Sequence, residues 1–147
     1  MPRMSDPAVE TSALRNTPFF AELAPEDLES ILRVSQPVSF ETGQAIVEAG
    51  DVGDGMYIIV DGTAEVDVGG RYHTLKRGDF FGEMALIAAK KRMATVKAVE
   101  PVQAVKVPAD EFQSFLLQHP SVALSMLKAL VERLREVEQR IDALMGM

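Results

Sequence analysis

Regularly spaced glycine and aspartate residues between positions 38 and 107 constrain the fold of this chain more than any other feature. Short apolar runs in this stretch alternate with pairs such as Asp61-Gly62 and Gly78-Asp79. Turn signals at such short intervals predict many short strands, and therefore an antiparallel sandwich or barrel-like roll. One hairpin is expected over residues 63–75, where apolar and polar residues alternate up to a turn at Gly69-Gly70.

Helical patterns precede and follow this stretch. Residues 15–35 are expected to be helical, because Pro25 suits a first helical turn and the apolar residues after it fall on one face. From residue 109 a short helix should contain Phe112 and Phe115, and a long helix should begin at Pro120. The sequence therefore predicts an α+β fold: an antiparallel, jelly-roll-like β-roll flanked by an N-terminal helix and by C-terminal helices, the last of which is long.

The length of 147 residues allows one domain with a short appendage. Residues 1–14 are small and polar and are expected to form a mobile lead-in. The domain is expected over 15–120, and 121–147 should form a C-terminal helix that acts as a lid or in dimerisation. The longest apolar runs are far shorter than the ~18–20 residues that cross a bilayer, and the start lacks the apolar core of a secretory signal. We therefore expect a cytoplasmic protein that does not enter a membrane.

Charge and residue types exclude several kinds of chemistry. Fifteen lysines and arginines against 22 acidic residues give a net charge of −7, which disfavours nucleic acid as a partner. The lack of cysteine excludes disulfides, zinc–thiolate sites, iron–sulfur clusters and a cysteine nucleophile. His73 and His119 lie in separate segments, and two histidines are too few for the metal centre of a cupin-type barrel. We therefore expect no catalytic residue, no metal and no enzymatic activity.

Apolar residues in the last predicted helix recur at intervals of 3, 4, 3, 4 and 3, which is a heptad pattern. These residues are Leu127, Leu130, Leu134, Val137, Ile141 and Leu144. Arg133 and Glu138 fall at g and e positions, where opposite charges attract across a parallel dimer. The pattern predicts a homodimer through this helix. The alternative is that the stripe packs on the chain's own β-roll, because so short a run does not separate a 3.5-residue from a 3.6-residue repeat.

The segment 78–96 contains the residues with the most specific chemistry. Gly82 allows a ligand to approach the backbone, and the N–H groups of the turn after it form an anion site. Arg92 can bind a phosphate through two parallel hydrogen bonds. Glu83 would repel a phosphate, but it can accept a hydrogen bond from a hydroxyl such as that of ribose. A phosphate and a sugar hydroxyl on one small molecule indicate a nucleotide.

The run Phe81-Gly82-Glu83-Met84-Ala85-Leu86, with Arg92-Met93-Ala94-Thr95-Val96 after it, resembles the phosphate-binding cassette of cyclic nucleotide-binding domains. These domains occur in the catabolite activator protein, the regulatory subunits of protein kinase A and cyclic nucleotide-gated channels. The resemblance covers roughly residues 17–140 and includes Phe19-Phe20 before the first helix and His119-Pro120 before the long one.

The resemblance implies a role for each residue of the cassette. Gly82 and the backbone around Met84 and Ala85 would meet the cyclic phosphate. Glu83 would accept the ribose 2′-hydroxyl, and Arg92 would pair with an exocyclic phosphate oxygen. The loop over 88–91 lacks the glycine and proline that are common before this arginine, and the charge of its two lysines, at 90 and 91, should aid the capture of an anion.

The base side of the pocket would be lined by Met93 and Ala94, with Val66 as a further contact. Members of the family that prefer cGMP often carry threonine at the position of Met93, where its hydroxyl bonds the guanine amino group. Methionine cannot make that bond, so the sequence favours cAMP over cGMP as the ligand, with cGMP still open. A residue within 121–140 is expected to close over the base.

Three functions fit these features. The first is a regulatory module that binds a cyclic nucleotide as a homodimer and relays occupancy through its C-terminal helix, by way of Leu86, Phe112 and Phe115, to an unidentified effector protein. The second is a degenerate cyclic nucleotide-binding fold that serves as a dimerisation or docking module. The third is the sensor part of a catabolite-activator-type transcription regulator. The sequence contains no helix-turn-helix after its long helix, which argues against direct promoter binding if the chain is complete.

Overall fold

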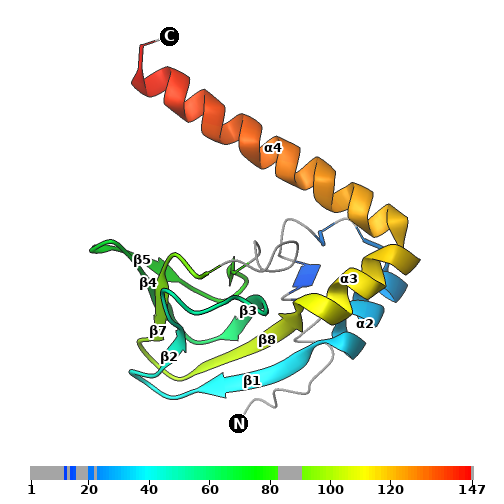
Figure 1. Cartoon of the computed structure of the whole chain (residues 1–147), viewed down its shortest axis with the longest axis horizontal. Helices are drawn as coiled ribbons and strands as arrows, with labels where there is room; N and C mark the ends of the chain where they lie inside the picture. The colour runs from blue at the N-terminus through cyan, green and yellow to red at the C-terminus, as the bar shows by residue number, and fades with distance from the viewer. Residues whose placement is uncertain (1–11, 13, 16–19, 22, 83–90, 147) are drawn as a thin grey trace.

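The computed structural model describes residues 12, 14, 15, 20, 21, 23–82 and 91–146. Among these residues, eight strands form a roll of two antiparallel four-stranded sheets, with helices at one end of the roll (Figure 1). The strands are β1 Gln36–Phe40, β2 Ala45–Val47, β3 Gly55–Asp61, β4 Ala64–Val68, β5 Arg71–Leu75, β6 Phe80–Phe81, β7 Thr95–Ala98 and β8 Val102–Pro108. One sheet has the order β1-β8-β3-β6 and the other β2-β7-β4-β5. The predicted antiparallel roll is confirmed.

The hairpin of β4 and β5 forms where the sequence predicts it. Val66 lies opposite His73, and Val68 lies opposite Arg71 across the Gly69-Gly70 turn. Val66 is buried while its polar neighbours in β4 are half-buried, as the alternation in the sequence requires. His73 is exposed on the edge strand.

The helices around the roll include α2 Pro25–Val34, α3 Ala109–Gln118 and α4 Pro120–Leu144. The predicted helical stretch over 15–35 is interrupted: Arg15 is helical, but Leu23 is not and Ala24 is extended. Pro25 disfavours the helical conformation in the residue before it, so α2 begins at the proline itself. The short helix with Phe112 and Phe115 and the long helix from Pro120 are confirmed.

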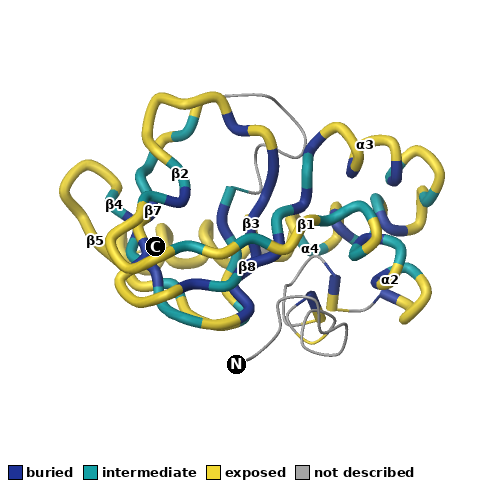
Figure 2. The backbone as a smooth tube through the Cα atoms, turned by 90° about the horizontal axis from the view of Figure 1, so that it is seen from below, coloured by how far each residue is buried: buried dark blue, intermediate teal, exposed yellow. Residues whose placement is uncertain are grey.

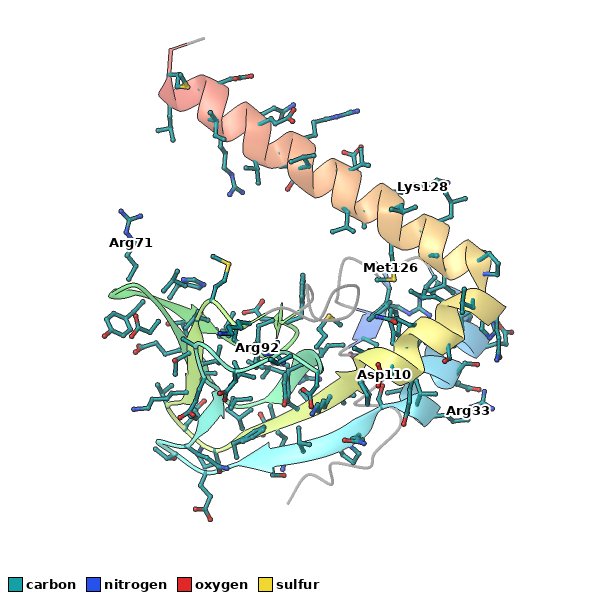
Figure 3. All side chains as sticks on the ribbon, in the orientation of Figure 1. Arg33, Arg71, Arg92, Asp110, Met126 and Lys128 are labelled. Atoms are coloured by element: carbon teal, nitrogen blue, oxygen red, sulfur yellow. The ribbon has the colours of Figure 1, made fainter. Side chains whose placement is uncertain are left out.

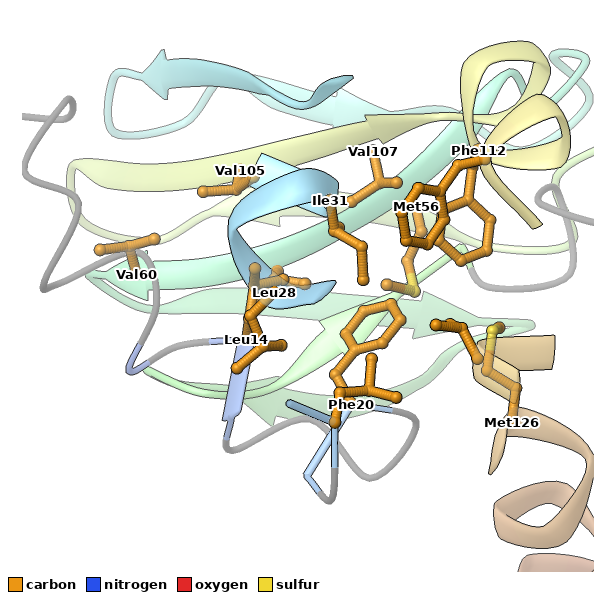
Figure 4. Close-up of a cluster of buried hydrophobic side chains, with 14 residues drawn as sticks. Leu14, Phe20, Leu28, Ile31, Met56, Val60, Val105, Val107, Phe112 and Met126 are labelled. Carbon is orange, nitrogen blue, oxygen red and sulfur yellow. The ribbon is translucent and has the colours of Figure 1, made fainter. Parts of the chain in front are cut away.

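Strand β3 separates two hydrophobic clusters. Its side chains at Met56, Ile58 and Val60 face the helices, and those at Tyr57 and Ile59 face the second sheet. The helix-side cluster is shown in Figure 4 and also contains Leu14, Phe20, Leu28, Ile31, Val105, Val107, Phe112 and Met126. Leu14 is fully buried, so the last residue of the predicted lead-in contributes to this core.

Only the first part of α4 is packed on the domain. Val122 and Met126 are buried in the helix-side cluster, and Ala129 packs against it. From Leu130 to Gly146 every residue whose burial the structure describes is exposed. The helix leaves α3 and runs above the roll (Figure 1), so it lies behind the roll in the view from below (Figure 2). No helix in the described part of the chain is long and apolar enough to cross a membrane.

Candidate functional site

Backbone hydrogen bonds to the loop at 50–51 hold Arg92 in place. Its N–H donates to the carbonyl of Asp51 at 2.6 Å, and its carbonyl accepts from the N–H of Gly50 at 2.9 Å. A β-bridge between Val52 and Lys91 adds a further connection to the same loop. These contacts fix the point at which the chain enters β7, and they direct the side chain of Arg92 into the roll, on the side that faces α4 in the view of Figure 3.

The guanidinium of Arg92 is nearly buried, with 9% of the side chain exposed. Its Nη2 donates to the carbonyl of Gly55 at 2.9 Å and lies 3.8 Å from Oδ1 of Asp54. Its Cζ lies 6.0 Å from the centre of the Tyr57 ring, within range of a cation–π contact. A guanidinium has five N–H donors, so it can keep these partners and still bind an anion.

Gly82 lies against the same guanidinium. Its φ is +80°, and a Cβ at this position would overlap Nη1 of Arg92 and come within 3.1 Å of the Gly55 carbonyl. The left-handed backbone favours glycine at residue 82, and a Cβ there would require the end of the Arg92 side chain to move. The structure brings together Gly82 and Arg92, which are ten positions apart in the sequence.

Aromatic rings position the start of the cassette. Phe81 in β6 pairs with Tyr57 in β3, and the two rings stack at 5.2 Å with 9° between their planes. The ring of Phe40 makes an edge-on contact with Tyr57, with 6.3 Å between the ring centres. Stacking of this kind contributes about 0.5–1.5 kcal/mol beyond the area that it buries. It fixes Phe81, and through Phe81 it fixes the backbone of Gly82 beside Arg92.

A carboxylate and a second cation complete the surroundings of Arg92. Oδ2 of Asp54 accepts a hydrogen bond from Nζ of Lys106 at 2.8 Å. That hydrogen bond from Lys106 lowers the pKa of the Asp54 carboxyl below its usual value, although partial burial acts in the opposite direction. For Lys106, partial burial acts to lower the pKa, but the hydrogen bond to Asp54 and nearby negative charge outweigh it and raise the pKa. Both groups are therefore charged near neutral pH.

The structure describes only some of the other residues that were predicted to contact the ligand. Glu83, Met84, Ala85 and Leu86 lie outside the described residues. Val66 is buried in the cluster between the sheets, and Ala94 packs against the same cluster. Met93 is 81% exposed. The base-side residues Val66 and Ala94 thus share one cluster, whereas Met93 projects from the surface.

Sequence reasoning missed Asp54, Gly55 and Lys106 as part of this site. In the sequence, Asp54 and Gly55 carry only a turn signal. Lys106 had a recognisable signal, because it continues the buried row of Val102 and Ala104 on one face of β8. A lysine in such a row requires a partner, and that partner is Asp54.

His119 takes a structural position. His119 stacks on Phe115 at 4.3 Å between ring centres, and its Nδ1 lies 3.8 Å from Oδ1 of Asp27 in α2. In the described part of the chain no group of three histidine, cysteine or acidic residues could hold a metal ion. The chemistry that the described site supports is therefore the binding of an anion by a pre-positioned guanidinium.

The sequence is similar to those of known proteins. The model of the cyclic nucleotide-binding domain family matches residues 37–119. A cyclic nucleotide-gated potassium channel of Rhizobium etli is 36% identical over 116 residues, which is 79% of this chain and 33% of the channel. The cyclic AMP receptor protein of Thermus thermophilus is 29% identical over 137 residues, which is 89% of this chain and 63% of the receptor.

A solved structure agrees over nearly its full length. The N-terminal domain of a transcriptional regulator from Streptomyces coelicolor superposes with a TM-score of 0.77 at 27% identity, covering 88% of this chain and 94% of that domain. The family match spans more than half of the chain and includes β2 to β8, all of β1 except its first residue, Gly82 and Arg92. The chain belongs to the cyclic nucleotide-binding domain family. It spans about a third of the channel and just under two thirds of the receptor.

Proposed function

We propose that this protein is a regulatory module that binds a cyclic nucleotide, with cAMP favoured over cGMP, and that it has no catalytic activity of its own. The observation that carries the proposal is the nearly buried guanidinium of Arg92, held against Gly82 in a domain of the cyclic nucleotide-binding family. Arg92 would pair with an exocyclic phosphate oxygen, and Gly82 with the backbone near Met84 and Ala85 would surround the phosphate. Glu83 would accept the ribose 2′-hydroxyl.

The preference for cAMP is the finer part of the proposal. Val66 and Ala94 lie in one apolar cluster, which suits the flat face of a purine. Met93 offers no hydroxyl for the guanine amino group, so guanine gains nothing over adenine at that position. The 81% exposure of Met93 leaves its side chain able to lie against a base at the surface of the roll.

We further propose that the protein is a homodimer through α4. The supporting observation is the exposed apolar row Leu127, Leu130, Leu134, Val137, Ile141 and Leu144, each between 40% and 87% exposed in the single chain. Their heptad spacing suits a second copy of the same helix. The alternative that this row packs on the chain's own roll receives no support, because α4 is packed on the core only through its first turns.

Ligand binding at the site would be relayed to an effector protein by a movement of α3 and α4. Phe112 and Phe115 of α3 are buried in the same cluster as Val122 and Met126 of α4, so a shift of α3 would be transmitted to the long helix. Leu86, the proposed contact from the cassette, would couple the ligand to these rings. We also propose that the nucleotide-binding domain covers 15–120 and that 121–147 form the lid or dimerisation helix. The protein would act in the cytoplasm on an effector protein that is not identified.

Isothermal titration calorimetry with cAMP, cGMP and 5′-AMP tests the proposed ligand. We expect cAMP to bind with a micromolar or lower Kd, cGMP to bind more weakly, and 5′-AMP, which lacks the cyclic phosphate, to bind weakest. Tighter binding of cGMP than of cAMP would contradict the proposed preference. No binding of either cyclic nucleotide would favour a degenerate fold that acts as a dimerisation or docking module.

A further inference from the structure

One carboxylate lies between two cations at this site. Asp54 presents Oδ2 to Nζ of Lys106 at 2.8 Å and Oδ1 to Nη2 of Arg92 at 3.8 Å. The side chains of Lys106 and Arg92 are 19% and 9% exposed, whereas that of Asp54 is 70% exposed. Lys106 therefore holds Asp54 by a short hydrogen bond, and Arg92 has only the longer, weaker contact with it.

The backbone explains why the two cations share this carboxylate. Lys106 of β8 lies directly opposite Tyr57 of β3, so both side chains are on the face that looks into the roll. Lys106 and Arg92 lie 5.8 and 6.0 Å from the centre of the Tyr57 ring, and Asp54 precedes β3 by one residue. The carbonyl of Asp54 also accepts a hydrogen bond from the N–H of Ala109 at 2.8 Å, which fixes this turn to the start of α3.

This arrangement matters for an anion at Arg92. A phosphate must compete with Asp54 for the guanidinium and is repelled by its charge. A carboxylate that is hydrogen-bonded to a second cation competes less. We infer that Lys106 is a positioning residue for ligand binding: it keeps Asp54 paired with itself and so leaves the charge of Arg92 available to an anionic ligand. This inference rests on the proposed function of Arg92.

A ligand-free comparison tests the sharing of Asp54 directly. The side-chain N–H signals of Arg92, assigned with Arg92→Lys, are followed by ¹⁵N NMR in the wild type, Lys106→Met, Asp54→Asn and the double variant. In Lys106→Met we expect these signals to shift and the rotation of the guanidinium to slow, because Asp54 then turns to Arg92. In the Asp54→Asn background, Lys106→Met should leave them unchanged. Identical Arg92 signals in the wild type and Lys106→Met would overturn the inference.

The same four proteins are then titrated with cAMP. We expect Lys106→Met to weaken binding about tenfold, Asp54→Asn to strengthen it about threefold, and Lys106→Met to change the Kd less than about twofold once Asp54 is neutral. Lys106→Arg should restore most of the affinity, and Lys106→Gln replaces Lys106→Met if the latter does not fold. An equal loss in both backgrounds would mean that Lys106 affects binding independently of Asp54, and would overturn the inference. Failure of the wild type to bind any cyclic nucleotide would instead refute the proposed function, and the NMR comparison would still decide how Asp54 is shared.

Discussion

At the scale of single residues, the contact between Gly82 and Arg92 is the feature on which the site depends. Gly82→Ala would force a Cβ onto Nη1 of Arg92 at a positive φ. We expect it to weaken cAMP binding at least about tenfold and to destabilise the fold by about 1–3 kcal/mol.

Gly43→Ala is the matched control, because Gly43 has a φ of +85° but nothing within 4 Å of the added Cβ. It should lose about 1–2 kcal/mol of stability and bind cAMP as the wild type does. Equal binding by both variants would contradict the account.

Asp54 also makes the stability of the folded chain depend on pH. Its pKa is lowered in the folded state by the hydrogen bond from Lys106, so its contribution is present above the unfolded pKa of about 3.9 and is lost as the pH falls through the lower folded value. The wild type should therefore exceed Asp54→Asn in unfolding free energy at pH 7, by less than about 1 kcal/mol because the carboxylate is largely exposed. Urea denaturation from pH 7 to pH 2 measures the gap between the two proteins. A gap that widens in acid would contradict a lowered pKa for Asp54.

At the scale of elements, α4 divides into a packed part and an exposed part. Met126 is 6% exposed in the helix-side core, and Leu134 is 59% exposed two turns further on. Met126→Ala should destabilise the domain by about 2–4 kcal/mol, because it leaves a cavity. Leu134→Ala should cost the single chain less than about 1 kcal/mol. Denaturation at protein concentrations low enough to favour single chains measures the loss of unfolding free energy in each variant. Equal losses would mean that the exposed part of α4 packs on its own domain.

The elements themselves could be predicted from the sequence wherever the signal was local. Alternation predicted β4 and β5 with their turn, and Pro120 predicted the start of α4. Pro25 correctly indicated the first turn of α2, but the helical stretch predicted from residue 15 runs through Leu23 and Ala24, which are not helical. The group around Arg92 could be predicted only in part. Gly82 and Arg92 belong to one local motif, but Asp54 and Lys106 are 52 residues apart and meet only through the pairing of β3 with β8.

At the scale of the whole molecule, the exposed row on α4 predicts association of two copies. Leu134→Asp with Ile141→Asp would place four charges in the seam of a parallel dimer. We expect the dimer Kd from sedimentation equilibrium to rise at least about a hundredfold. Gln139→Asp, on the opposite side of the helix, is the control and should change it less than about threefold. A wild type that sediments as a single chain at about 100 micromolar, or a pair of aspartates without effect, would contradict the proposed dimer.

The central claim is that Arg92 binds the phosphate of a cyclic nucleotide, and the cAMP affinity of Arg92→Ala tests it most directly. Removal of a nearly buried, charge-assisted phosphate contact should cost on the order of 2–4 kcal/mol, which is roughly a 30- to 1000-fold rise in Kd. Lys97→Ala, at an exposed cation on β7, is the control and should leave the Kd within about twofold of the wild type. If Arg92→Ala binds cAMP as tightly as Lys97→Ala does, Arg92 is not the phosphate contact and the account is wrong.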